Sequence, residues 1–224
     1  MPRSAAQSAQ RYPLTAILGN ETNVRLLREL SRHGGHLSAP DLVRRTGLAK
    51  TSVWAGLMSL EEMDLVSVAG TGRARLYSMR ADHPLHGVLD TLFEAEERRF
   101  NAILEAIREA AHACGPSVVA VWLYGSVARG EDRPGSDLDI AVFAVENALP
   151  NVSDAMRDAL HSAGMKLGFK PSVVGIGSDD VARLSGERDP WWVQLVRDAI
   201  VLVGPHPDDS ARPRRHAGRR RAMA

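Results

Sequence analysis

The chain has 224 residues, of which 44% are hydrophobic and 25% are charged, and its formal net charge is +1. This length suits one large or two small domains with buried cores, and the composition is that of a soluble globular protein. The single cysteine, Cys114, excludes an intrachain disulfide and favours a reducing compartment. The sequence has no apolar run of the roughly 20 residues that a membrane span needs, and no apolar core of a signal peptide. We therefore expect a cytoplasmic protein with no membrane partner.

The net charge conceals three regions of different sign. Residues 1–80 carry a charge of +5, residues 81–210 a charge of −10, and residues 211–224 a charge of +6. The last of these contains six arginines and almost no side chains to bury, which predicts a disordered Arg-rich tail over 205–224. Residues 1–13 are also expected to be disordered. If the chain binds a polyanion such as nucleic acid, the binding is expected near its ends; the alternative for the tail is a solvated segment without a partner.

Helical patterns follow in the first third of the chain. Apolar residues recur at helical spacing over residues 14–35. A short helix is then expected from the N-cap Ser38 through Thr46, and a second one over residues 50–63. Gly47 supplies the turn between these two helices. Two short helices joined by a glycine-containing turn predict a helix-turn-helix.

Residues 65–69 and 75–79 are β-prone and flank a glycine-rich turn, which predicts a hairpin. Helix, helix-turn-helix and hairpin in this order resemble a winged-helix DNA-binding domain over residues 14–80. The resemblance implies that double-stranded DNA is a partner and that the second helix of the pair enters the major groove. The side chains that it implies contact DNA are Lys50, Thr51 and Ser52 on that helix, Arg73 and Arg75 on the wing, and Arg44 and Arg45 as phosphate clamps.

Two alternatives remain open for this region. A winged helix can serve protein contacts alone, and Trp54, among the early residues of the second helix, suits packing as well as base readout. Residues 81–114 carry one apolar stripe at helical spacing and predict a long connecting helix, in which Gly87 is a weak point. That helix can pack on the following domain or pair with a second copy, which leaves a homodimer open.

Two carboxylates open the second of two predicted strands in residues 115–145. Period-two geometry sends Leu138, Ile140 and Val142 to one face of that strand. Asp137 and Asp139 therefore share the opposite face, and two carboxylates so close repel each other. A divalent cation relieves the repulsion, and Mg²⁺ or Mn²⁺ takes carboxylate and phosphate oxygens as ligands. The pair therefore predicts a metal site with a catalytic role.

A glycine-serine turn ends the preceding strand. Gly125 permits close approach of the backbone to a ligand, and amides around Ser126 can meet anionic phosphate oxygens. Arg129 adds a cation in the same loop. A nucleoside triphosphate on one side and a metal ion on the other is an arrangement for phosphoryl transfer, with catalysis by positioning and charge neutralisation.

Gly125-Ser126, then Ala128-Arg129-Gly130, then Ser136-Asp137-Leu138-Asp139 resemble the signature of minimal nucleotidyltransferases of the polymerase-β-like superfamily. The resemblance covers residues 115–204 and implies nucleotide contacts from Gly130 and Ser136 as well. It implies transfer of a nucleoside monophosphate from a triphosphate, with release of pyrophosphate. The fold class expected for the whole chain is α/β (α+β): a winged helix-turn-helix, a connecting helix, and a nucleotidyltransferase-like mixed sheet flanked by helices.

The sequence departs from the family pattern downstream. Active members usually supply a third carboxylate from a later strand, which here is expected over residues 170–176. The matching position is Ser172, which cannot be a carboxylate ligand. Asp179 and Asp180 are interpreted as a capped helix start, and the two tryptophans at 191 and 192 are interpreted as packing in a closing helix.

Three functions follow from these features. The chain is a working nucleotidyltransferase whose winged helix brings it to DNA or to a protein acceptor. Alternatively, it is a DNA-binding transcriptional regulator with a degenerate nucleotidyltransferase domain that senses nucleotide. In a third, lower-ranked reading it is an antitoxin that nucleotidylates a partner toxin. The intact Gly-Ser and Asp-x-Asp elements favour the first function, and the serine at the third position favours the second.

Overall fold

The computed structural model describes residues 14–211, so that the predicted N-terminal segment, 1–13, and residues 212–224 of the predicted tail over 205–224 lie outside the described residues. The chain divides between Arg98 and Arg99 into two compact units, called unit 1 and unit 2 below. None of the helices in residues 14–211 has the length and apolar character needed to cross a membrane.

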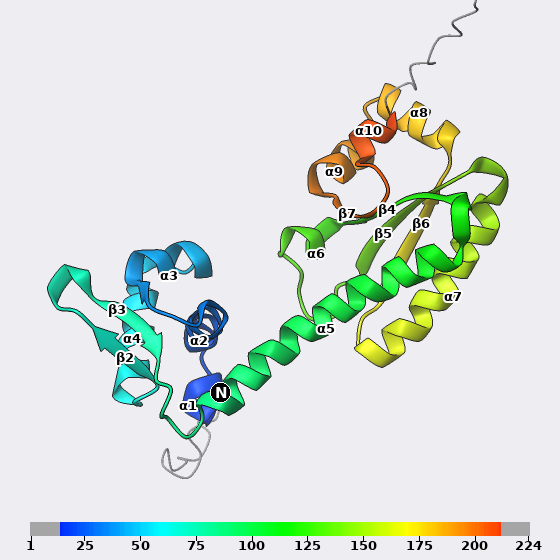
Figure 1. The fold of residues 1–224 in the computed structure, drawn as a ribbon. Coiled ribbons are helices and arrows are strands. Elements are labelled where there is room, and N and C mark those ends of the chain that lie inside the picture. Colours follow the sequence, from blue (N-terminus) through cyan, green and yellow to red (C-terminus); the bar gives the residue numbers. More distant parts are fainter. Residues whose placement is uncertain (1–13, 212–224) are drawn as a thin grey trace, which may run out of the picture. The chain divides into compact units, whose positions relative to one another are not determined.

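Unit 1 contains helices and one small sheet (Figure 1). In chain order its elements are α1 (Leu14–Leu18), α2 (Glu21–His33), β1 (Leu37–Ser38), α3 (Ala39–Thr46), α4 (Lys50–Glu62), β2 (Val66–Ala69), the 3₁₀ turn η1 (Gly72–Ala74) and β3 (Leu76–Met79). The strands form an antiparallel sheet in the order β1-β3-β2. The two short helices and the hairpin lie where the sequence predicts them.

The first helical stretch is broken in two, unlike the continuous pattern expected over residues 14–35. Asn20 ends the continuity because its side-chain oxygen accepts a hydrogen bond from the backbone N–H of Thr22 at 2.9 Å, which caps α2. Further along, the predicted N-cap is confirmed, since Ser38 Oγ accepts from the Asp41 N–H at 3.2 Å. Gly47 follows α3 with φ +67°, a left-handed conformation that favours glycine.

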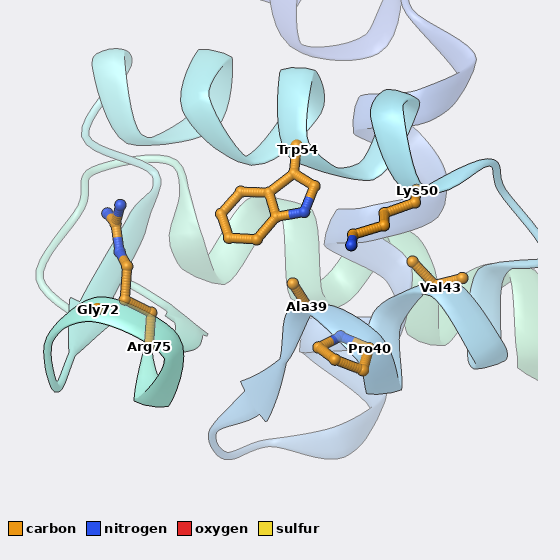
Figure 2. A pocket seen from close by; sticks show the side chains of 7 residues that line it. All are labelled: Ala39, Pro40, Val43, Lys50, Trp54, Gly72 and Arg75. Carbon is orange, nitrogen blue, oxygen red and sulfur yellow. The ribbon is translucent and has the colours of Figure 1, made fainter.

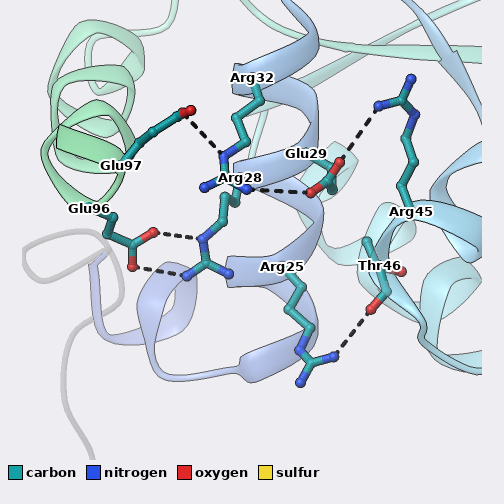
Figure 3. A network of polar contacts seen from close by, with 8 residues as sticks. All are labelled: Arg25, Arg28, Glu29, Arg32, Arg45, Thr46, Glu96 and Glu97. Atoms are coloured by element: carbon teal, nitrogen blue, oxygen red, sulfur yellow. Dashed lines mark hydrogen bonds and ion pairs between the residues drawn. The ribbon is translucent and has the colours of Figure 1, made fainter. Parts of the chain in front are cut away.

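The core of unit 1 contains the inward faces of α2, α3 and α4, the hairpin, and the first turns of α5 (His86–Ala113). Its largest fully buried side chains include Tyr77 and Phe93. Gly87, the predicted weak point, lies in the first turn of α5, where a helix tolerates glycine better than in its middle. A polar network on the same helices, shown in Figure 3, joins Arg28 to Glu96 at 2.6 Å and Arg32 to Glu97 at 3.7 Å.

Unit 2 contains a four-stranded sheet with helices on both faces (Figure 1). After the second half of α5, its elements are η2 (Gly115–Ser117), β4 (Val118–Tyr124), α6 (Gly125–Arg129), β5 (Leu138–Ala144), η3 (Glu146–Ala148), α7 (Leu149–Leu167), β6 (Pro171–Ile176), α8 (Ser178–Gly186), α9 (Pro190–Asp198), β7 (Ile200–Val203) and α10 (Pro207–Ala211).

The sheet has the order β6-β5-β4-β7 and is mixed. Strand β4 pairs antiparallel with β5 and β7, and β5 pairs parallel with β6. A parallel pair needs a crossover connection, and α7 supplies it. Leu138, Ile140 and Val142 pack with α5 and α7 on one face, as their alternation predicts, while Trp122 and Ala141 pack with α8 and α9 on the other. The mixed α/β fold class is thereby confirmed.

The C-terminal part of unit 2 corrects one expectation. A disordered tail was expected from residue 205, but α10 forms over Pro207–Ala211. Trp122 Nε1 donates a hydrogen bond to the Pro205 carbonyl at 2.8 Å, which fixes the chain against the sheet before α10 begins. The expectation is wrong for residues 205–211 because this short segment finds a partner in the buried indole, which the charge of the following residues does not reveal.

Candidate functional site

The Gly-Ser turn and the Asp-x-Asp pair meet at one edge of the sheet in unit 2. Tyr124, the last residue of β4, pairs with Asp139 of β5, and α6 starts at the next residue, Gly125. Gly125 has φ +76°, and a Cβ built on it would overlap the carboxylate of Asp139. Both the conformation and the contact therefore require glycine at this position. The first turn of α6, with Ser126, lies directly beside the second carboxylate of the pair.

Asp139 is half-buried, and its burial raises the pKa of its carboxyl group. A hydrogen bond from the Ser172 side chain lowers that pKa, the negative charge of Asp137 raises it, and the positive charge of Arg129 lowers it. The net shift is upward. The electrostatic contact between Asp137 and Asp139 agrees with the expectation that the two carboxylates share one region at the start of β5.

Asp137 lies immediately before β5, and its side chain is 42% exposed. Its Oδ1 atom is 2.9 Å from Nζ of Lys170, whose side chain is 76% exposed. Lys170 is fixed through its backbone, because its carbonyl accepts a hydrogen bond from the Leu138 N–H at 2.8 Å. The sequence reasoning missed Lys170. The signal that would have found it is its position directly before the strand that runs parallel to β5.

The position of the third carboxylate is occupied by a hydroxyl. Ser172 is the register partner of Asp139 in the parallel pair β5–β6, and its side chain is near enough to that carboxylate to lower the pKa of Asp139. Within residues 14–211, no group of three or more His, Cys, Asp or Glu side chains is arranged to hold a metal ion. Asp180 does not substitute, since its carboxylate accepts from the Gly177 N–H at 3.3 Å and caps α8 as predicted. The two aspartates therefore fit one divalent cation that also has phosphate oxygens as ligands, but not a fully protein-bound ion.

Arg129, expected to face phosphate, is bonded to two acidic side chains. Its Nε donates to Glu131 at 2.8 Å, and its Nη1 donates to Asp198, whose side chain is only 3% exposed. Asp198 also accepts from Arg197, and these hydrogen bonds, that of Arg197 first, hold its pKa below the usual range. Asp198 thus ties the end of α6 to the end of α9. No sequence motif marks it.

The other residues expected to contact nucleotide shape the loop between α6 and β5. Gly130 follows α6 with φ +68° and donates its N–H to the carbonyls of that helix. Ser136 Oγ accepts from the Arg133 N–H at 3.0 Å, which closes the tight turn before the aspartates. The interpretation of the tryptophans as packing is confirmed, because Trp192 packs edge-on against Trp122 and Trp191 against Tyr124.

The residues expected to contact DNA lie on α3, α4 and the hairpin of unit 1. Lys50, Thr51 and Ser52 form the first turn of α4, and Arg73 lies in η1. The arginines Arg44, Arg45 and Arg75 have acidic partners: Asp41 at 2.7 Å, Glu29 at 3.9 Å and Glu61 at 2.9 Å, respectively. Figure 3 shows the contact of Arg45 with Glu29. Lys50 has no ion pair among the described residues.

A cavity of about 560 Å³ separates these elements (Figure 2). Trp54 and Lys50 of α4 point into it, and Arg75 lies on its opposite side, at the hairpin. Trp54 is 37% exposed and makes a T-shaped contact with the ring of Tyr77. The residues that line the cavity are Ala39, Pro40, Val43, Lys50, Trp54, Gly72 and Arg75. The groove brings two of the predicted DNA-contacting cations to one surface.

A known protein family matches a segment of unit 2. Residues 105–175 match the family described as polymerase beta, nucleotidyltransferase. No curated protein matches the chain. Among solved structures, a toxin–antitoxin with AMP-PNP shares 21% identity, covers 48% of this chain and 80% of its own, and has a TM-score of 0.33.

Two further solved structures are similar at the same low level. A mutant of the toxin–antitoxin MntA-HpeT shares 19% identity over 48% of this chain and 80% of its own, with a TM-score of 0.33. PigF with SAH shares 18% identity over 78% of this chain and 60% of its own, with a TM-score of 0.25. Likeness at these values carries no argument about activity. The family match concerns residues 105–175 alone, and it shows that this segment of unit 2 is similar to the polymerase beta nucleotidyltransferase family.

Proposed function

We propose that unit 2 binds a nucleoside triphosphate together with Mg²⁺ or Mn²⁺ at the edge of the sheet formed by Gly125, Ser126, Asp137 and Asp139. The observation that carries the proposal is the contact of Gly125 with Asp139, inside the segment that matches the nucleotidyltransferase family. This contact supports the proposal, because the turn proposed to approach phosphate and one of the carboxylates proposed to hold a metal lie side by side.

Asp137 and Asp139 are the residues that hold the divalent cation in this proposal. When bound, the cation neutralises phosphate charge and thereby supports transfer of a nucleoside monophosphate. The backbone at Gly125 and Ser126 orients the phosphates, and Asp198 positions α6 through Arg129. Gly130 and Ser136 fix the loop that carries the aspartates. Catalysis here rests on positioning and charge rather than on a dedicated base.

The serine at the third position limits the chemistry. Ser172 cannot accept a proton from an acceptor hydroxyl at neutral pH, and general-base assistance typically contributes about 10²–10⁴-fold. We therefore propose slow transfer of a nucleoside monophosphate to a protein or nucleic-acid acceptor. The alternative, a nucleotide-sensing regulator without transfer, is favoured by the same observation, because a serine is the register partner of Asp139 where a third carboxylate would activate an acceptor.

A transfer assay separates the two functions. Labelled triphosphates are supplied with candidate protein and nucleic-acid acceptors to the wild type, Ser172→Asp and Asp137→Asn. If the protein is an enzyme, the wild type labels an acceptor slowly, Ser172→Asp labels it faster, and Asp137→Asn does not label it. A sensor labels nothing in any form, while bound nucleotide changes its affinity for DNA.

We also propose that unit 1 binds double-stranded DNA through α4 and the hairpin. The support is the groove between α3, α4 and η1, with Lys50, Trp54 and Arg75 on its walls, and the charge of +5 in residues 1–80. Phosphate contacts release counterions, so affinity for a duplex should fall steeply with added salt. If the intact protein binds no duplex in a salt-sensitive way, unit 1 is a protein-contact module instead.

A further inference from the structure

The ion pair between Lys170 and Asp137 introduces a positive charge into the site that the nucleotidyltransferase signature does not include. Nζ of Lys170 is 2.9 Å from Asp137 Oδ1, on the carboxylate that is proposed to hold the divalent cation. The backbone of Lys170 is fixed by the hydrogen bond from Leu138, and β6 begins at the next residue. The lysine is therefore placed beside Asp137 by the sheet itself, and only its side chain has freedom to move.

The charges around the two carboxylates differ from those of a site with three acidic ligands. Ser172 contributes no charge, and the charges that face Asp139 are those of Asp137 and Arg129. Arg129 itself is shared between Glu131 and Asp198, so Lys170 is the cation with a direct contact to the pair. An ammonium group next to a carboxylate reduces the attraction of that carboxylate for a second cation.

We propose that Lys170 is a built-in counter-cation of Asp137, which weakens the binding of a divalent cation to the nucleotide-free site. The inference rests on the proposed function of unit 2. A triphosphate supplies negative charge that offsets Lys170, so the metal enters the site with the nucleotide rather than before it. Because Lys170 is 76% exposed, its side chain has room to leave Asp137 when the metal–nucleotide complex arrives.

The degree to which Lys170 weakens metal binding depends on how exposed its ion pair with Asp137 is to solvent. Both partners reach solvent, with side chains 76% and 42% exposed, and exposed ion pairs are weak because water screens them. The expected effect on metal affinity is therefore moderate, roughly two- to fivefold. The same exposure means that changing Lys170 should not unfold the protein.

The test measures Mn²⁺ binding to the full chain without nucleotide, by following the electron paramagnetic resonance signal of unbound Mn²⁺. Lys170→Met should bind Mn²⁺ roughly two- to fivefold more tightly than the wild type, and Lys170→Arg should match the wild type. The gain should disappear in the double variant Lys170→Met, Asp137→Asn. Lys166→Met is the matched control, since Lys166 is an exposed lysine of α7 with no ion pair among residues 14–211, and it should change nothing.

The inference is overturned if Lys170→Met binds Mn²⁺ no more tightly than the wild type, or if its gain persists without the Asp137 carboxylate. A parallel titration of the wild type with Mn²⁺ and a non-hydrolysable ATP or GTP analogue tests the proposed function separately. Metal-dependent nucleotide binding with no effect of Lys170 removes the inference alone. Absence of metal-dependent nucleotide binding removes the proposed function and the inference with it.

Discussion

The two units hold their candidate functional residues in different ways. In unit 1 the cations stand on exposed surfaces of α3, α4 and the hairpin, and Arg44, Arg45 and Arg75 are each bonded to an acidic neighbour. In unit 2 the carboxylate of Asp139 is half-buried against a glycine that no other residue can replace without a clash. A single substitution on a surface of exposed charges should reduce affinity only slightly, whereas a single substitution in a packed site should abolish binding. Substitutions can test this difference.

The largest effect is expected at the contact between the turn and the carboxylate. Gly125→Ala adds a methyl group that overlaps Asp139 at a left-handed φ of +76°, which combines backbone strain with overpacking and should cost about 2–4 kcal/mol of unfolding free energy. Nucleotide binding should be lost as well. Urea unfolding and calorimetry measure the two losses.

Gly130→Ala is the matched control for that substitution. Gly130 also has a left-handed φ, +68°, but a Cβ there would meet nothing within 4 Å. Only the backbone penalty of about 1 kcal/mol is expected. A Gly125→Ala variant that is no less stable than Gly130→Ala would show that the contact with Asp139 is not a close one.

A smaller effect is expected from the exposed cations of unit 1. Lys50→Ala should weaken duplex binding roughly fivefold and reduce the slope of log affinity against log salt by about one, because one phosphate contact is lost. Arg44→Ala should weaken it less, since Arg44 must first leave Asp41, 2.7 Å away. Fluorescence anisotropy of a labelled duplex at several salt concentrations measures both.

Lys166→Ala serves as the control for charge alone, because it removes one lysine from unit 2. A loss of affinity from Lys166→Ala equal to that from Lys50→Ala would mean that net charge, and not the surface of α4, attracts the duplex. In that case the proposed interface in unit 1 is wrong.

The smallest effect is expected from Asp139→Asn, which should raise the stability of the fold by an amount that depends on pH. The folded-state pKa of Asp139 is raised, chiefly by burial, so the folded protein binds this proton more tightly than the unfolded chain does. Stability from this group is therefore lost as pH rises from its unfolded pKa, about 3.9, through the raised folded value. Asp139→Asn removes the buried charge and should raise the Tm by about 1–2 °C at pH 7 in EDTA.

The gain from Asp139→Asn should shrink in acid, where the wild-type carboxyl group is protonated too. Thermal melts at pH 7 and pH 3 check this. If the melting temperature of the variant lies below that of the wild type by the same amount at pH 7 and at pH 3, the upward shift of the Asp139 pKa is contradicted.

Local signals explain which parts of this structure the sequence predicted. Ser38 caps α3, Gly47 turns the chain, and the alternation of Leu138, Ile140 and Val142 selects a face of β5, all through interactions within a few residues. The Gly-Ser turn was also recognisable, because a glycine at positive φ is a local requirement. Even so, the break at Asn20 was missed, since the apolar spacing continues across it.

The side-chain contacts around the site could not be predicted from the sequence, because the two partners of each contact are far apart in the chain. Arg129 and Asp198 are 69 residues apart, and Lys170 reaches Asp137 only through the parallel pairing of β5 with β6. Composition and periodicity do not specify the register of a parallel pair. The same pairing places Ser172 beside Asp139, so one register determines both what the site lacks and which cation it gains.

Asp137 and Asp139 are proposed to bind a divalent cation together with a nucleoside triphosphate. Isothermal titration calorimetry of the full chain with a non-hydrolysable ATP or GTP analogue, in Mg²⁺ and in EDTA, tests this claim most directly. We predict binding by the wild type that requires Mg²⁺ and that is lost in the Asp137→Asn, Asp139→Asn double variant. The same affinity in that double variant, or in EDTA, would contradict the claim.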